Sequence, residues 1–202
     1  MNILGKPEQI IVFQQNQLLS LPPTTPPLTS PFPILLSSGG TLDPLATIHL
    51  RLCRRSNPVL LSAVINWSAT FTPPATAAVL NFAGYVDVTF EILVNGFVIY
   101  AVTQTAVQKG LPVNSAVLFS LAVPTFEIAS LLHLDMRHIF KACSSRELVY
   151  TLRATNVSLV APQVASGVAT VSAEVGAVTF VAQEIRDRCA SRSILSRDPH
   201  PY

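Results

Sequence analysis

The residues of this chain best suited to chemistry are four histidines, three cysteines and eleven acidic side chains. His133 and His138 lie five positions apart, with Asp135 between them. A helical zinc pair instead places its histidines four positions apart, which puts both imidazoles on one face. No third ligand is evident nearby, so we expect no metal site.

Sequence patterns of nucleophilic or phosphate chemistry are also missing. The sequence has no G-x-S-x-G nucleophile elbow, and only Gly39 and Gly40 are adjacent, so it has no glycine-rich phosphate loop. A glycosidase pair would require two acidic residues to meet in space, and most acids fall at outward strand or loop positions. We therefore expect no catalytic residue, no cofactor and no enzyme activity. The acids considered are Asp87, Glu91, Glu127, Asp135, Glu147, Glu174 and Glu184.

The three cysteines are Cys53, Cys143 and Cys189, and none forms a C-x-x-C pair that would indicate zinc. Their odd number leaves at least one unpaired within the chain. Cys189 lies in a polar C-terminal segment, where an intermolecular disulfide would form easily. Ordinary reduced thiols are the alternative.

The composition restricts where the apolar residues can go. Half of the residues are hydrophobic and 12% are charged, against about 25% charged in an average soluble domain. No apolar run reaches the roughly 18 residues of a membrane helix, so we expect no membrane partner. The surplus must be buried in a core, in subunit interfaces or in a polymer. The net charge of +2 is too small to imply a nucleic-acid partner.

The N-terminal region reads as an extended arm over residues 1–40. Its apolar run from Ile10 to Phe13 is too short for a secretory signal, so we expect synthesis and first assembly in a cytoplasm. Residues 20–35 hold six prolines and should form a polyproline-II spacer. The preceding β-like segment could dock on an edge of its own sheet or a neighbour's. The proline-rich stretch is either a plain linker or an arm that holds this segment in position to reach another subunit. The predicted docking residues are Ile10, Ile11, Val12 and Phe13.

The segment Val86–Val107 predicts one long β-hairpin that turns at Asn95-Gly96, because a type I′ turn needs positive φ at both central residues. Alternation before the turn gives one apolar face, which Phe97, Ile99 and Ala101 should continue. The second face is also apolar near the turn, and a face exposed to water should not be. We interpret that second face as a subunit contact formed by Leu93, Val98, Tyr100 and Val102.

Strand-like segments with regular turn spacing continue through residues 41–185. They predict an all-β fold, an antiparallel jelly-roll sandwich of about eight strands. Trp67 is expected in the core or at an interface. Residues 125–147 fit either a short helix or a strand plus loop, since their apolar spacing suits both. Residues 186–202 form a polar basic tail, for which binding to a polyanion is an alternative to plain solvation.

Three pieces of the sequence together resemble a known family. They are the proline-rich leader, the hairpin FEILVNGFVIY with the polar run Thr103-Gln104-Thr105 after it, and the closing segments LVYTLRATN (148–156) and AVTFVAQEI (177–185). They are similar to exosporium-type surface proteins of bacterial spores, whose domain resembles the jelly roll of tumour necrosis factor and complement proteins. The resemblance implies a homotrimer, built in the mother-cell cytoplasm and deposited in the outer spore layers. A spore-appendage subunit, linked to the next by its N-terminal arm, is a related interpretation.

Two hypotheses of function follow from these observations. The first is a structural, self-assembling protein of a spore surface layer or fibre, whose partners are copies of itself and other spore surface proteins. The second is a β-sandwich binding module, or fibre head, that recognises a carbohydrate or a receptor. The resemblance carries over no functional residue, because the family has no catalytic motif.

Overall fold

A computed structural model describes residues 10–18, 33–52, 57–74, 78–109, 116–117, 122–136 and 147–185, with only the backbone described for 10–18, 78 and 116–117. Every regular element within these ranges is a β-strand, and the strand pairs are antiparallel. The prediction of an all-β antiparallel fold is confirmed. The three cysteines, His138, His200, the proline-rich stretch 19–32 and the tail 186–202 lie outside the described residues.

The first sheet is built around the longest strand, β12 (Thr170–Ile185). Its neighbours in the order β1-β12-β4-β9 are β1 (Ile10–Leu18), β4 (Val59–Thr72) and β9 (Val123–Asp135). The short β2 (Ile34–Leu36) also pairs with β12. This sheet therefore carries both the N-terminal strands and the last strand of the described chain.

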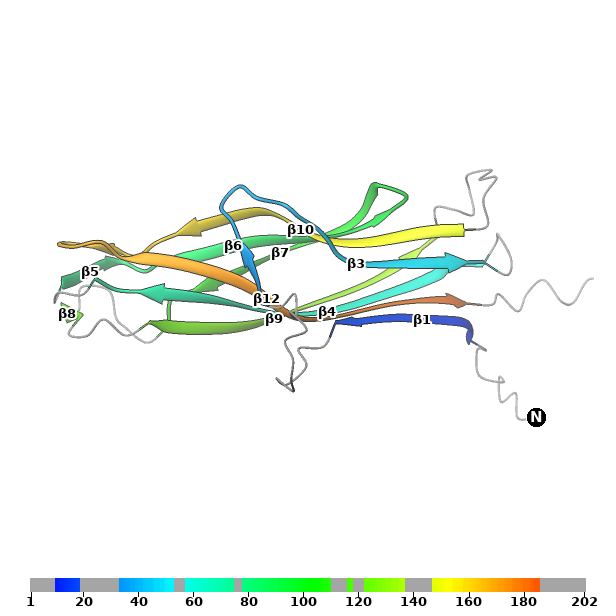
Figure 1. Cartoon of the computed structure of the whole chain (residues 1–202), viewed down its shortest axis with the longest axis horizontal. Helices are drawn as coiled ribbons and strands as arrows, with labels where there is room; N and C mark the ends of the chain where they lie inside the picture. The colour runs from blue at the N-terminus through cyan, green and yellow to red at the C-terminus, as the bar shows by residue number, and fades with distance from the viewer. Residues whose placement is uncertain are drawn as a thin grey trace, which may run out of the picture.

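The second sheet has the order β3-β10-β6-β7, formed by β3 (Leu42–Arg51), β10 (Glu147–Val160), β6 (Tyr85–Val94) and β7 (Phe97–Val107). Short strands β11 (Gln163–Val164), β5 (Ala78–Phe82) and β8 (Ala116–Val117) form a small third sheet. The long strands run along the longest axis of the molecule, and β5 and β8 lie at one end (Figure 1).

The core lies between the inner faces of the two large sheets. Alternate residues of β4 point inward from Val59 to Phe71 and are buried. Trp67, on this inner face, meets Phe90 of the opposite sheet edge-on, with ring centroids 6.3 Å apart. Of the two places expected for Trp67, the structure shows the core. Such strict alternation is the pattern of a strand whose one face is packed.

The Asn95–Gly96 turn lies at the centre of the strand pairing. Asn95 and Gly96 have φ of 48° and 84°, as a type I′ turn requires. Residues that pair across neighbouring strands often lie about equally far from this turn in sequence, one before it and one after it. Val59 thus lies opposite Asp135, and Ile10 lies opposite Ile185. These pairs of the described chain are therefore arranged about the turn like successive rungs of one antiparallel hairpin.

Because of a β-bulge in the hairpin, the side chains of β7 beyond it point to the face opposite to the one predicted. Leu93 lies opposite Val98, but Ile92 lies opposite Tyr100, so Ile99 is an extra residue in the ladder. An extra residue reverses the faces of the strand beyond it. The prediction that one outer face holds all four hairpin residues is therefore wrong.

The four residues instead occupy different surroundings. Tyr100 and Val102 lie on the core side and are half-buried, Leu93 is buried within its own subunit, and Val98 remains 41% exposed. Ala101, predicted on the core side, lies opposite Glu91 and is exposed. Whether any of the four contacts another subunit stays a prediction.

For residues 125–147 the sequence left two alternatives, a short helix or a strand plus loop, and the structure decides between them for part of the segment. β9 covers residues 125–135 as a strand, which excludes the helix there. Residues 137–146 lie outside the described part. The helix-like spacing arose because both faces of β9 carry apolar residues, and a strand with two apolar faces imitates a helical period.

Replacing a core leucine should cost far more stability than replacing an outward one. Leu61 is fully buried, whereas Leu35 is 67% exposed. Leu61→Ala should lower the free energy of unfolding by about 2–5 kcal/mol, and Leu35→Ala by about 0.5 kcal/mol or less. Urea denaturation followed by tryptophan fluorescence measures both. Equal losses would contradict this assignment of faces.

Candidate functional site

Within the described residues, no group of three or more His, Cys, Asp or Glu side chains could hold a metal ion. His49 contacts Glu147 at 3.4 Å. His133 stacks on Tyr100 with ring centroids 5.2 Å apart. Among the same residues, no helix has the length and apolar character needed to span a membrane.

The outer face of β9 carries a row of exposed apolar side chains, which we call the β9 stripe. The residues of β9 that point inward include Ala129, Leu131 and Asp135, and all three are buried. Strict alternation then directs the intervening residues away from the core. The stripe consists of Phe126 (75% exposed), Ile128 (63%), Leu132 (66%) and Leu134 (45%).

The β9 stripe continues onto the neighbouring strand. Ser130, in its middle, lies opposite Val64 of β4, which is 40% exposed on the same face. Soluble monomers rarely expose a contiguous apolar patch of this kind, and such patches mark sites of interaction. The stripe is thus the strongest candidate for a contact surface among the described residues.

An open pocket of about 400 Å³ lies at one end of the β9 stripe. Two rows across the sheet form it: Phe126 lies beside Ser68, which lies beside Glu174, and Ile128 lies beside Asn66. The Ser68 hydroxyl donates a hydrogen bond of 3.4 Å to Glu174. The pocket combines apolar walls with a carboxylate and an amide, so it suits a group that is partly apolar and can donate hydrogen bonds.

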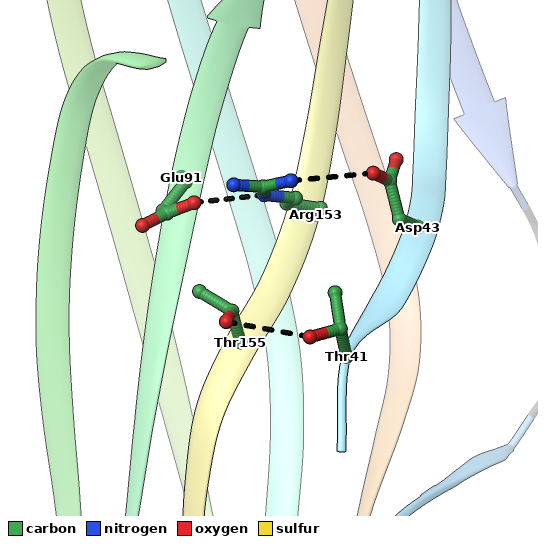
Figure 2. Close-up of polar contacts among 5 residues, drawn as sticks. All are labelled: Thr41, Asp43, Glu91, Arg153 and Thr155. Atoms are coloured by element: carbon green, nitrogen blue, oxygen red, sulfur yellow. Dashed lines mark hydrogen bonds and ion pairs between the residues drawn. The ribbon is translucent and has the colours of Figure 1, made fainter. Parts of the chain in front are cut away.

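A cluster of paired charges lies on the outer face of the second sheet. Arg153 of β10 donates a hydrogen bond of 2.8 Å to Glu91 of β6 and lies 3.5 Å from Asp43 of β3 (Figure 2). The bond to Glu91 raises the pKa of Arg153. In the next row, Thr41 lies 3.5 Å from Thr155. These contacts join three strands, so we assign the cluster a structural role.

Two carboxyl groups are buried at one end of the sandwich. Asp135 and Glu184 are both opposite Val59, on its two sides, and neither is exposed. Asp135 accepts a hydrogen bond of 2.9 Å from the Tyr150 hydroxyl, and Glu184 accepts one of 2.6 Å from the Asn57 amide. These bonds offset part of the cost of burying polar groups. Burial first, and then Asp135, raises the pKa of Tyr150 far above its ordinary value.

Comparison with known proteins adds no family assignment. No protein-family model matches the chain, and no curated protein matches it.

The sequence interpretation missed the β9 stripe, although its signal is present. Phe126, Ile128, Leu132 and Leu134 are spaced by even numbers of residues, which is the spacing of one strand face. Ala129 and Leu131, which are apolar residues on the other face of the strand, obscured this two-residue spacing. The predicted arm residues 10–13 belong to β1, whose backbone pairs with β12 of the same chain.

Removing the Tyr150 hydroxyl tests the buried Asp135 bond. Tyr150→Phe should lower the free energy of unfolding by about 1–3 kcal/mol, because the carboxyl loses a buried partner. The folded protein holds the Tyr150 proton to higher pH than the unfolded chain. Its stabilising effect is therefore complete below about pH 10 and falls as pH rises further.

Denaturation at pH 7 and at pH 10–11 measures both effects. Tyr150→Phe should remove part of the alkaline loss of stability. Tyr85→Phe is a matched control, since Tyr85 is 38% exposed. A variant as stable as the wild type, with the same alkaline slope, would contradict the assigned role of the bond.

Proposed function

We propose that this chain is a structural, self-assembling protein that acts through contacts between copies of itself. The β9 stripe is the observation that carries the proposal. Four large apolar side chains, each at least 45% exposed, lie in line on one strand. Obligate subunit interfaces resemble a domain core cut in half, and a stripe of this kind supplies such a surface.

The low charge of the chain supports the same proposal. Only 12% of its residues are charged, and on the second sheet Arg153 is paired with both Glu91 and Asp43. Net charge and scattered surface charge are what keep a monomer apart from its copies. A chain with so little of either is suited to a permanent assembly.

We infer further that the sandwich is wound as a jelly roll. Strands on opposite sides of the Asn95–Gly96 turn pair in succession: β6 with β7, β4 with β9, β3 with β10, and β2 with β12. Rolling up one long antiparallel hairpin gives that order. The setting in a spore surface layer or appendage, and the trimer, are proposals that rest on the sequence resemblance.

The N-terminal strand supplies a possible link between subunits. β1 and β2 occupy the same edge of β12, where Leu18 lies opposite Val178 and Ile34 opposite Val175. These β12 positions are roughly 10 Å apart. The residues between Leu18 and Ile34 include six prolines, and in polyproline-II form they would reach about 45 Å. We propose that β1 exchanges onto the β12 edge of a neighbouring copy.

A proline in β1 tests the exchange in the full chain. Gln15→Pro removes a backbone donor and disrupts the ladder with β12. Multi-angle light scattering at micromolar concentration should show assemblies for the wild type and smaller ones for Gln15→Pro. Thr25→Pro, in the stretch that already holds prolines, should assemble like the wild type.

Two outcomes separate the claims. A wild type that is monomeric across this concentration range would refute self-assembly. Assemblies of unchanged size in Gln15→Pro would refute the strand exchange alone.

A second candidate function, binding of a carbohydrate or receptor, is supported by the pocket beside Phe126. An exposed aromatic ring next to Glu174 and Asn66 offers an apolar surface with hydrogen-bonding groups at its side. Sugars present both kinds of surface.

A glycan array with the full chain tests this second function. A ligand that occupies the pocket should bind about tenfold or more weakly to Glu174→Gln, because hydrogen bonds to a charged group are lost. Glu147→Gln, on the other sheet, is the matched control. An array without hits, or hits that ignore Glu174→Gln, would refute this candidate.

A further inference from the structure

We propose that two copies of this chain join edge to edge through β9, with a two-fold axis at Ser130. This inference deepens the proposed function and rests on it. It names the partner of the β9 stripe, a second copy of the same strand, and the register in which the two strands meet.

Strand β9 has an unpaired edge within the described chain. β9 pairs with β4 from Val123 to Asp135, and no other strand of the described chain hydrogen-bonds to its opposite edge. Side chains alone connect it with the other sheet there, through the His133–Tyr100 stack and the Lys109–Glu127 ion pair of 2.9 Å. A long edge strand presents a row of backbone donors and acceptors that a second strand can satisfy.

The outer face of β9 is complementary to itself in one register. Antiparallel pairing about Ser130 places Ile128 opposite the partner's Leu132, and Phe126 opposite the partner's Leu134. A two-fold axis repeats each pair, because residue i meets j and j meets i. The whole β9 stripe is then matched, apolar to apolar, on one continuous face of a sheet shared by the two copies.

The inner face of β9 selects the same register. Pairing about Ser130 brings Glu127 opposite the partner's His133, a carboxylate opposite an imidazole that can donate a hydrogen bond. Moving the axis to Leu131 would instead place Glu127 opposite the partner's Asp135, two carboxyl groups face to face. Moving it to Ala129 would place Ile128 opposite Ser130 and break the apolar match.

The end of the strand fits this register as well. Paired residues run from Thr125 to Asp135 on each copy, so the overlap stops just before Pro124. Proline has no N–H to donate, and it is found at edges and ends of pairing. No residue within the overlap is a proline or a glycine, so each can contribute a backbone donor and a side chain.

A cysteine on the axis tests the register directly. The full chain carries Cys53→Ser, Cys143→Ser and Cys189→Ser, and Ser130→Cys is added. Directly opposed residues of antiparallel strands have Cα atoms about 4.5–5.5 Å apart, within the range of a disulfide. Mild oxidation should give a disulfide-linked dimer on a non-reducing gel. Ser172→Cys, exposed on β12 of the same sheet, should stay monomeric on that gel.

Charge substitutions test the pairing of Ile128 with the partner's Leu132. The double variant I128D/L132D places like charges opposite each other twice, whereas I128K/L132D places opposite charges there. Both lose the same apolar side chains. The dimer dissociation constant of I128D/L132D should be about tenfold or more above that of I128K/L132D. Mixing I128D/L132D with I128K/L132K should give a mixed dimer that is tighter than the dimer of either variant alone.

The outcomes distinguish this inference from the proposed function. An assembled protein whose Ser130→Cys form gives no linked dimer, or links no faster than Ser172→Cys, overturns the β9 junction and leaves self-assembly standing. The same holds if the charge variants weaken assembly without Ser130→Cys linkage, since another surface or another segment of the chain then covers the stripe. A protein that is monomeric throughout overturns both.

Discussion

The turn at Asn95–Gly96 is the constraint on which the rest of the structure depends. Two successive residues there hold positive φ, a conformation that Asn and Gly tolerate and most residues do not. From that point the two halves of the chain run side by side, and their partners remain near the same sequence distance from the turn out to Ile10 and Ile185. The pairs β6–β7, β4–β9, β3–β10 and β1–β12 follow this one hairpin, and the pairs β6–β10 and β4–β12 join them into the two sheets.

Sequence reasoning recovered those features that depend on local rules. The Asn-Gly turn, the alternation of β4 and the antiparallel class follow from φ preferences and a period of two. The facing of β7 could not be recovered, because the bulge at Ile99 depends on how Leu93 and Val98 pair across strands. One inserted residue moved Tyr100 from the outer face to the core side, and alternation alone carries no sign of it.

The candidate surface shows a related limit. β9 is apolar on both sides, so its pattern fits a helix and a strand equally well until a neighbour fixes one face. Once Leu131 and Ala129 are buried in the core between the sheets, the outward position of Leu132 and Ile128 follows. The buried bond between Glu184 and Asn57 likewise joins residues 127 positions apart, and no local pattern indicates such a contact. The local sequence pattern therefore predicts secondary-structure elements better than it predicts which side chains are exposed on the surface.

The place of β12 in the chain has a consequence for biosynthesis. It lies between β4 on one side and β1 and β2 on the other, yet it is the last strand of the described chain to leave a ribosome. Inner pairs such as β6 and β7 can close early, and each later pair then closes only a short additional loop. The N-terminal strands must wait for β12 throughout translation. A growing polypeptide thus carries β1 without its own acceptor edge, while finished copies nearby already possess one.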